Sequence, residues 1–222
     1  MAEGCRASRK GRAIRPLLIA TNNRGKLREY RQILAGLPFV LTSLDEQGLD
    51  FEVPEEGATF AANAIAKARA YAAASGLLTL ADDSGLEVEA LGGEPGVRSA
   101  RYAGEGASDA ERIALLLSRL TGVPPERRQA RFVCVIAVAE PGGQVRTVTG
   151  HVSGVIAPRP KGSGGFGYDP VFYIPELGRT MAELSAAEKN RISHRARAGQ
   201  AARDLLASSY AEPDAGKPGS AA

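Results

Sequence analysis

The sequence predicts a mixed α/β fold, in which helices flank a central sheet with both parallel and antiparallel strands. In the first half of the chain, short apolar segments alternate with amphipathic helical segments, which is typical of parallel strands joined by helices. Further on, the turn Pro141-Gly142-Gly143-Gln144 joins two long β-rich segments, which indicates an antiparallel hairpin. With 222 residues, 44% of them hydrophobic and 24% charged, the chain suits one large globular domain or two small ones.

The first predicted elements are a strand at residues 17–20, a polar loop and a helix. The loop is Thr21-Asn22-Asn23-Arg24-Gly25-Lys26, and the apolar stripe of the following helix is formed by Leu27, Tyr30, Ile33 and Leu34. Such a joint presents free backbone N–H groups and the positive end of the helix dipole to an anion, and Lys26 adds a full charge. The loop lacks the Walker pattern, and similar joints are common. Phosphate binding and a purely structural joint therefore both remain open.

A second helix is expected from Thr59, its N-cap, to Ser75, before a terminating Gly76. Asn63 and Lys67 fall on the stripe of this helix that is otherwise apolar. Both side chains are therefore candidates to face a cleft.

Two adjacent carboxylates follow the next predicted strand. That strand covers residues 77–81 and is expected to end in Asp82-Asp83-Ser84-Gly85. Because neighbouring residues of an extended chain point to opposite faces, one of the two Asp side chains is expected in the cleft. There it can hold Mg²⁺ or take a proton from water, and the alternative is a turn in which Asp caps the backbone.

The remaining elements are read from capping signals and apolar runs. Ser108 and Glu111 have the spacing of a capping box and start a helix that ends before Gly122. Strands are expected at residues 131–139 and 145–156. A second capping box at Ser185 starts one last helix, which is expected to run to about Leu206.

Two more segments place polar groups where a ligand could bind. In the segment 161–170, glycines surround Phe166 and Tyr168, either of which can stack on a base while Asp169 fixes its edge; a flexible surface loop is the alternative. The segment 188–195 gathers polar and cationic side chains on the first turns of the last helix. Cations at a helix start oppose its dipole, so a phosphate or a solvated charged face is expected there.

Charge and cysteine content restrict the class of protein. The net charge of +3 comes from the two ends, and 22 basic and 22 acidic residues balance between them, unlike a dedicated nucleic-acid binder. We expect a disordered basic arm at residues 1–15, one domain at 16–207 and a disordered tail at 208–222. Cys5 and Cys134 suggest no disulfide, with Cys134 in the core, and no secretory signal or membrane span is seen, so a cytoplasmic location is expected.

Taken together, these segments resemble the inosine triphosphate pyrophosphatase family, over residues 16–207. The blocks that carry the resemblance occur in one order along the chain. They are Thr21 to Lys26, Gly57-Ala58-Thr59-Phe60 with Asn63-Ala64 and Lys67-Ala68, Ala81-Asp82-Asp83-Ser84-Gly85-Leu86, Leu91-Gly92-Gly93 with Pro95-Gly96, Ser99-Ala100-Arg101-Tyr102, Gly165-Phe166-Gly167-Tyr168-Asp169-Pro170 and Ser193-His194-Arg195. The resemblance implies an elongated mixed sheet with two lobes around a central cleft, usually in a homodimer.

The resemblance also implies a reaction and a set of site residues. The reaction is Mg²⁺-dependent cleavage of deaminated purine nucleoside triphosphates between the α- and β-phosphates, which clears ITP, dITP and XTP from the nucleotide pool. Asp83 is implied as the proton acceptor and as a metal contact. Which of Glu52, Glu55 and Glu56 also approaches the metal stays open, and Glu52 and Glu55 are the candidates. The implied substrate-binding residues are Thr21, Asn22, Asn23, Arg24, Gly25, Lys26, Lys67, Ser84, Phe166, Gly167, Tyr168, Asp169, Lys189, His194 and Arg195.

Within that set, the lysines and Arg195 would clamp phosphates or help hold the base. Phe166 would stack on the purine, and Asp169 with His194 and Arg195 would read the keto group at position 6. Two alternatives are kept: a pyrophosphatase for modified pyrimidine triphosphates, and a nucleotide- or nucleic-acid-binding module without catalysis. Asp83 distinguishes an enzyme from a binding module, because a protein that only binds nucleotides has no need of this carboxylate. We expect a small-molecule substrate, with neither nucleic acid nor membrane as a partner.

Overall fold

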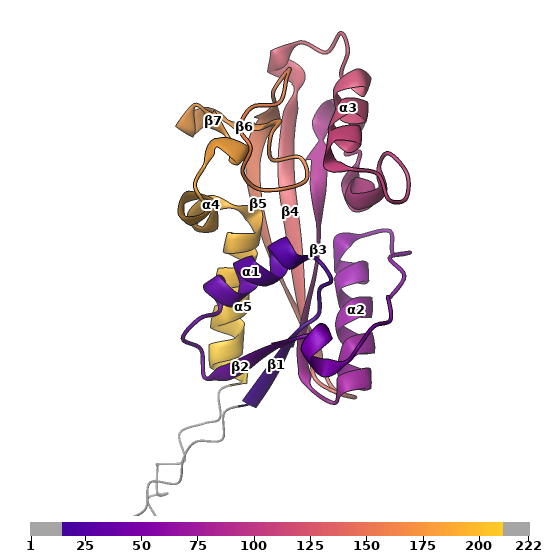
Figure 1. Ribbon diagram of the computed structural model, residues 1–222, viewed down its shortest axis with the longest axis vertical. Coiled ribbons are helices and arrows are strands. Elements are labelled where there is room, and N and C mark those ends of the chain that lie inside the picture. Colours follow the sequence, from indigo (N-terminus) through magenta and orange to yellow (C-terminus); the bar gives the residue numbers. More distant parts are fainter. Residues whose placement is uncertain (1–14, 211–222) are drawn as a thin grey trace, which may run out of the picture.

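A seven-stranded sheet of order β2-β1-β3-β4-β5-β6-β7 runs through the part of the chain that the structure describes (Figure 1). The computed structural model describes residues 15–210. β1 pairs in parallel with β2 and β3, and every later pair is antiparallel, so the predicted mixed sheet is confirmed. The strands are β1 (Arg15–Ile19), β2 (Phe39–Ser43), β3 (Leu78–Val88), β4 (Gln129–Ala139), β5 (Val145–Ile156), β6 (Phe172–Ile174) and β7 (Arg179–Thr180).

The hairpin predicted around Pro141 is confirmed as β4 and β5, which pair from Ala139 opposite Val145 onward. The expected end of β3 at Ala81 is wrong, because the strand continues to Val88. Asp82 and Asp83 therefore lie inside the strand, opposite apolar residues of β4. A strand interior tolerates these carboxylates because partners from other elements bind them, as described below.

Five α-helices are seen among the described residues: α1 (Arg24–Ile33), α2 (Phe60–Ser75), α3 (Asp109–Arg119), α4 (Ala186–Ile192) and α5 (His194–Ser209). The caps predicted for α2 are confirmed. The Thr59 side chain accepts a hydrogen bond from the Ala62 N–H, and Gly76 ends the helix with a φ of +68°, which a residue without a side chain adopts at little cost. Both predicted capping boxes, at Ser108 and Ser185, are also formed.

The single last helix of the prediction is wrong, since the chain breaks it at Ser193. Ser193 has extended backbone angles, ends α4 and caps α5 by accepting a hydrogen bond from Ala196 N–H at 3.1 Å. A serine side chain competes for backbone donors in this way, and here the competition starts a new helix. As a result, His194 and Arg195 occupy the first turn of α5, whereas Lys189 lies in the last turn of α4.

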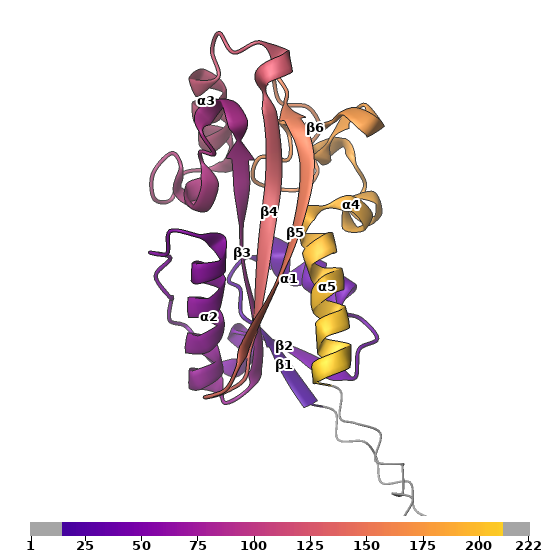
Figure 2. The same cartoon turned by 180° about the vertical axis from the view of Figure 1, so that it is seen from behind.

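Helices cover both faces of the sheet and divide the molecule into two lobes (Figures 1 and 2). In the lower lobe, drawn at the bottom of Figure 1, α2 covers one face while α1 and α5 cover the other, and each face has its own apolar core. In the upper lobe, α3 packs with the far ends of β3, β4 and β5 around a third core. The long strands β3 to β5 join the lobes, which confirms the elongated two-lobed architecture.

The first strand begins earlier and the last helix ends later than predicted. β1 begins at Arg15, and α5 continues to Ser209, followed by a buried Tyr210. The rest of the predicted arm, with Cys5, and most of the predicted tail lie outside the described residues. Cys134 is fully buried in β4, as expected for a core residue. Among the helices of residues 15–210, none has the length and apolar character to cross a membrane.

Candidate active site

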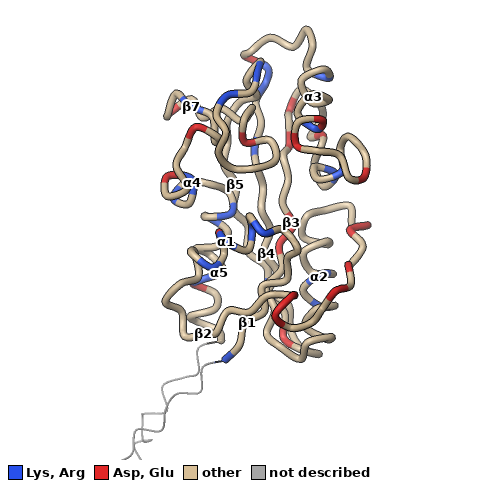
Figure 3. Tube along the Cα trace, viewed as in Figure 1, with Lys and Arg blue, Asp and Glu red and all other residues tan. Residues whose placement is uncertain are grey.

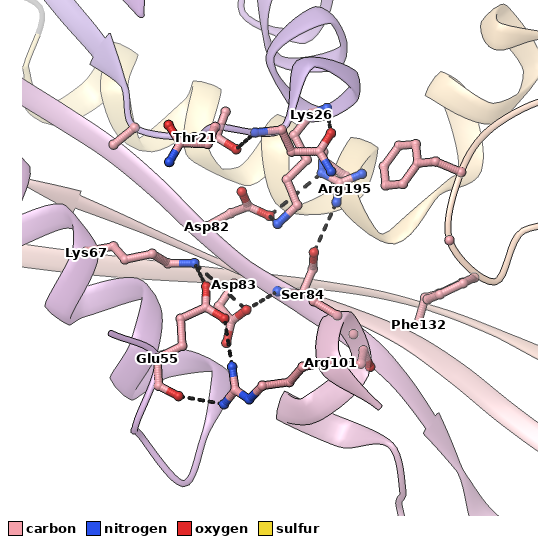
Figure 4. A pocket seen from close by; sticks show the side chains of 18 of the residues that line it. Thr21, Lys26, Glu55, Lys67, Asp82, Asp83, Ser84, Arg101, Phe132 and Arg195 are labelled. Atoms are coloured by element: carbon pink, nitrogen blue, oxygen red, sulfur yellow. Dashed lines mark hydrogen bonds and ion pairs between the residues drawn. The ribbon is translucent and has the colours of Figure 1, made fainter. Parts of the chain in front are cut away.

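A cavity of about 640 Å³ lies between the two lobes and gathers nearly all the predicted site residues (Figure 4). Its walls come from the β1–α1 loop, the segment before α2, the middle of β3, the start of α3, the glycine-rich loop and the α4–α5 junction. Of the predicted set, only Arg24 and Gly25 do not line it. Arg24 is exposed and borders a smaller pocket, and Gly25 packs behind Phe166, whose ring a Cβ would approach to 3.2 Å.

The β1–α1 loop differs from its prediction in one respect. The Asn23 side chain caps α1 by accepting hydrogen bonds from Gly25 N–H at 2.8 Å and Lys26 N–H at 3.1 Å. Thr21 Oγ1 in turn accepts from Asn23 N–H at 3.2 Å. These three backbone donors are therefore bound within the loop, and the Lys26 ammonium is the group that the loop offers to an anion.

Asp83 projects from β3 into the cavity and is held by its neighbours. Asn63 Nδ2 of α2 donates to Asp83 Oδ2 at 2.9 Å, and Asn63 Oδ1 accepts from Gly57 N–H at 2.7 Å. The other carboxylate oxygen accepts from Ser84 N–H at 2.9 Å. Asn63 is 1% exposed, so α2 fixes the carboxylate from behind while its front faces the cavity.

The charges around Asp83 tune its proton affinity. Burial raises its pKa, Glu55 adds to that effect, and Lys67 with the Asn63 hydrogen bond opposes it, leaving a net increase. Lys67 Nζ lies 2.5 Å from Glu55 Oε1 and 3.9 Å from Asp83 Oδ1. Burial alone would lower the pKa of Lys67, but Asp82, Asp83 and Glu55 raise it above the ordinary value, so this lysine is charged. Asp83 is thus a carboxylate with raised basicity beside a fixed cation.

Asp82, on the opposite face of β3, balances the charge of Lys26 and Arg195, and all three residues line the cavity. Its side chain is 1% exposed, and its Oδ2 lies 2.9 Å from Lys26 Nζ and 3.8 Å from Arg195 Nε (Figure 4). Burial would raise the pKa of Asp82, but Lys26, Arg195 and Lys67 outweigh it and hold the pKa below the ordinary value. The two Asp side chains separate by face as predicted, since Asp83 contacts Asn63 of α2 and Asp82 contacts Lys26 of α1. Both residues line the cavity, where one of them was expected.

A row of alternating charges continues from Asp82 toward the glycine-rich loop. Arg195 Nη1 lies 2.6 Å from Glu29 of α1, which lies 3.4 Å from Lys189 Nζ. Lys189 then contacts Asp169 at 2.6 Å. Each buried cation of the row has carboxylate partners, which keeps the row charged and fixed. Arg195 Nη2 also donates to Ser84 Oγ at 3.0 Å.

Phe166 lies above this row at the other end of the cavity. Lys189 Nζ is 4.5 Å and the Arg195 guanidinium 5.4 Å from the centre of its ring, distances that suit cation–π attraction. Half-buried between these cations and the cavity, the ring offers an aromatic platform at which a base can stack.

His194, beside that platform, stacks on Phe132 at 4.7 Å and is 5% exposed. Its Nδ1 is buried and has no hydrogen-bond partner among the described residues. Burial, with Arg195 and Lys189 close by, lowers the pKa of His194 well below the ordinary value, so the ring is neutral. A neutral imidazole carries one donor and one acceptor nitrogen, which suits the reading of a base edge.

Tyr168 and Asp169 line the cavity but are engaged by the protein itself. The Tyr168 ring is buried in the upper core, and its hydroxyl donates to Ser99 O at 2.9 Å. Asp169 Oδ2 accepts from Phe166 N–H at 2.9 Å and from Lys189 Nζ at 2.6 Å. Gly165 must lack a side chain, because a Cβ would lie 2.0 Å from the same oxygen. Both residues therefore shape the loop that presents Phe166.

The carboxylates predicted to bind metal are unevenly placed. Glu55 lies in the cavity wall next to Lys67, Glu52 is exposed at the rim, and Glu56 does not line the cavity. No cluster of three or more His, Cys, Asp or Glu side chains suited to a metal occurs within residues 15–210. Asp83 and Glu55, which share Lys67, nevertheless supply the hard oxygen donors that Mg²⁺ takes together with substrate phosphates.

Four residues of the site were not among the predicted site residues. Asn63 was expected to face the cleft with Lys67, but it is buried behind Asp83 and does not line the cavity; Asp82 was seen in a motif and was given no role. Glu29 lies three residues after Lys26, a spacing that places both on one face of α1, so helical periodicity was a usable signal. Arg101 stands in the motif block Ser99-Ala100-Arg101-Tyr102 but was given no role, because contacts between distant segments bring it to the cavity.

Comparisons with known proteins agree with this fold and site. The model of the Ham1 family matches residues 17–205. A relative named dITP/XTP pyrophosphatase from Geobacter sulfurreducens is 54% identical over 190 residues, which are 86% of this chain and 96% of that protein. Another of the same name, from Bacillus subtilis, is 51% identical over 179 residues, covering 81% of this chain and 90% of that protein.

A solved structure shows the same fold. The HAM1 protein from Coxiella burnetii superimposes with a TM-score of 0.81 at 42% identity, covering 87% of this chain and 98% of that chain. The family match over most of the chain and the high identity to relatives confirm the resemblance read from the sequence. The chain belongs to the Ham1 family.

Proposed function

We propose that this protein is a Mg²⁺-dependent pyrophosphatase that hydrolyses the deaminated purine triphosphates ITP, dITP and XTP to the monophosphate and pyrophosphate. The observation that carries the proposal is one cavity with two unlike ends: Asp83 beside Lys67 at one end, and Phe166 with His194 at the other. The names of relatives at 51% and 54% identity support the same substrate class.

Asp83 is the residue proposed to activate water. Its carboxylate takes a proton from the water that attacks phosphorus at the α–β anhydride, and the bond to the bridging oxygen breaks, so that pyrophosphate leaves. The raised pKa of Asp83 favours this proton transfer, and Asn63 keeps the carboxylate aimed at the cavity. Lys67 and Lys26 supply positive charge for the phosphates.

Mg²⁺ is proposed to bind at Asp83 and Glu55, with Glu52 at the rim as a further oxygen donor. The oxygen-only donor set supports a hard cation over a soft one. When bound, Mg²⁺ neutralises phosphate charge and acts as a Lewis acid. Glu55 and Lys67 are now paired with each other. When substrate binds, Glu55 would bind the metal and Lys67 a phosphate.

The end of the cavity that holds Phe166 and His194 supports selection for a keto group at position 6 of the purine. Phe166 provides the stacking face, Arg195 lies 5.4 Å from the centre of its ring, and His194 lines the same cavity. His194 and Arg195 are proposed to read the keto oxygen. An adenine amino group is a donor and leaves a donor in the pocket unpaired, at a cost of about 1–3 kcal/mol. This corresponds to roughly a 5- to 150-fold preference against ATP.

Two further expectations remain proposals that rest on the sequence. A homodimer is proposed from the family resemblance, and light scattering on the purified protein tests it. A cytoplasmic location, with no role in binding nucleic acid, is proposed from the neutral body of the chain and its cysteine usage. Figure 3 agrees with a neutral body of the chain, since acidic and basic residues are interspersed over both lobes.

The substrate assignment is tested by measuring pyrophosphate release with Mg²⁺ from ITP, XTP, GTP, ATP and dUTP. We expect fast release from ITP and XTP and slow release from ATP; GTP separates reading of position 6 from reading of position 2. Equal rates on ITP and ATP would refute the role of His194 and Arg195. Preference for dUTP would favour the pyrimidine alternative, and no turnover despite nucleotide binding would favour a binding module.

A further inference from the structure

Arg101 enters the cavity from the upper lobe because a short 3₁₀ helix, η3 (Gly96–Arg101), packs directly on β3. Ser99 Oγ accepts from Leu86 N–H at 2.8 Å and donates to Gly96 O at 2.6 Å. This approach needs a glycine at position 85, since a Cβ there would lie 2.5 Å from both Ser99 Oγ and Gly96 O. The contact fixes the end of η3 beside the middle of β3, which carries Asp83.

The Arg101 side chain reaches across to the segment before α2 (Figure 4). Its Nη2 donates to the backbone oxygen of Glu55 at 2.7 Å, whereas its Nη1 stays 3.6 Å from Glu55 Oε2, outside hydrogen-bond distance. The Glu55 carboxylate is bound by Lys67 instead, at 2.5 Å. Arg101 is 31% exposed and lines the cavity, so its guanidinium keeps donors free for a ligand.

The two lysines at this end of the cavity are already paired with carboxylates, so an anionic ligand needs a further cation. Lys26 is paired with Asp82 at 2.9 Å, and Lys67 is paired with Glu55 at 2.5 Å. A triphosphate is a polyanion, and these two lysines already share their charge with carboxylates. Arg101 has no carboxylate that close, and a planar guanidinium binds phosphate oxygens with two parallel hydrogen bonds.

We propose that Arg101 is a substrate-binding residue that contacts the part of the triphosphate that leaves as pyrophosphate. Phosphate oxygens would replace Glu55 as its partner, and Lys67 would contact the same group from the lower lobe. A pyrophosphate held by both side chains ties the two lobes together across the cavity. The inference rests on the proposed function and adds to it a residue that the sequence motifs left without a role.

A purely structural role makes a different prediction. If Arg101 only holds the backbone of Glu55, its loss alters the cavity as a whole and weakens every ligand alike. A matched control is Arg98, which belongs to the same 3₁₀ helix but is exposed and does not line the cavity.

The test measures binding of pyrophosphate and of IMP by calorimetry in the presence of Mg²⁺, for the wild type, Arg101→Gln, Arg101→Lys and Arg98→Gln. We expect Arg101→Gln to weaken pyrophosphate binding about tenfold or more and to leave IMP binding unchanged. Arg101→Lys should recover part of the loss, and Arg98→Gln should match the wild type. The KM for ITP should rise in parallel in Arg101→Gln.

Two results would overturn the inference while the proposed function stands: a wild type that binds pyrophosphate no better than Arg101→Gln does, or an Arg101→Gln variant that loses IMP and pyrophosphate equally. A wild-type protein that binds neither ligand and does not hydrolyse ITP would refute the proposed function, and the inference with it. The circular dichroism spectrum of each variant shows whether it is folded. If Arg101→Gln does not fold, Arg101→Lys is compared with the wild type in its place.

Discussion

Neutralising Asp82 removes the carboxylate that balances Lys26 and Arg195 in the cavity wall. In Asp82→Asn the shape of the side chain is kept, but Lys26 loses its partner at 2.9 Å and Arg195 loses one of its two carboxylates. Asp82 is 1% exposed at its side chain and Arg195 2%, so water cannot replace the missing charge. The perturbation is therefore electrostatic and local.

The expected cost is about 3 kcal/mol of unfolding free energy. Removing one partner of a buried ion pair costs about 3–5 kcal/mol, because the other charge stays buried and uncompensated. The lower end applies here, since Glu29 still lies 2.6 Å from Arg195 and Lys26 is partly exposed. For a domain of this size, about 2–4 °C per kcal/mol predicts a fall in Tm of about 6–12 °C.

Urea and thermal unfolding of Asp82→Asn beside Glu94→Gln measure this cost. Glu94 pairs with Arg119 on the surface, where both side chains are about half exposed, so its loss should be small. The folded pKa of Asp82 lies below its unfolded value, so its contribution is present above pH about 4 and disappears as the pH falls below it. A cost no larger than that of Glu94→Gln, or one that grows on acidification, would show that the Asp82 charge does not stabilise the fold.

Three further predictions concern stability and turnover. The wild type should lose stability as the pH falls below about 6.5, because unfolding lets the neutral His194 bind a proton; His194→Gln should remove up to about 1.4 kcal/mol per pH unit of that slope in thermal unfolding from pH 7 to 5. Asn63→Ala frees the Asp83 carboxylate, so kcat for ITP should fall about 10- to 100-fold with KM little changed; an unchanged kcat would contradict this. Asp109 Oδ2 accepts from Gly167 N–H at 2.7 Å, so Asp109→Ala should raise KM for ITP about fivefold through the glycine-rich loop, and a kcat effect alone would argue otherwise.

Elements with local signals could be predicted from the sequence. Thr59 and Gly76 mark the ends of α2, and the capping boxes at Ser108 and Ser185 start α3 and α4 as expected. In each case the residues that fix the helix end lie within four positions of one another, so no distant contact is needed. The hairpin of β4 and β5 follows for the same reason, because its turn residues are adjacent.

Elements that depend on distant contacts could not be predicted from the sequence. The Asp82-Asp83-Ser84-Gly85 motif reads as a turn, whereas partners from other elements, among them Lys26 and Asn63, allow its carboxylates to stay in a strand. Ser193 reads as a helix interior, although its side chain caps a new helix. Short strands such as β6 are set by the pairing of their neighbours and carry little pattern of their own.

The candidate site divides in the same way. The resemblance placed most of its residues at one cavity, since the motif blocks converge there. It missed that Asn23 uses the loop amides that an anion was expected to bind, because a side-chain cap and a phosphate leave the same sequence signal. It also gave no role to Arg101, although one of its blocks contains the residue, because the place of Arg101 depends on the close packing of η3 against Gly85.

Asp83 is proposed to be the proton acceptor in cleavage between the α- and β-phosphates. The measurement that tests it most directly is product analysis of ITP hydrolysis with Mg²⁺ by the wild type and Asp83→Asn, with IMP affinity measured for both. We expect equal amounts of IMP and pyrophosphate from the wild type, a rate lower by about a hundredfold or more in Asp83→Asn, and retained IMP binding. An active Asp83→Asn, or release of IDP and inorganic phosphate, would contradict it.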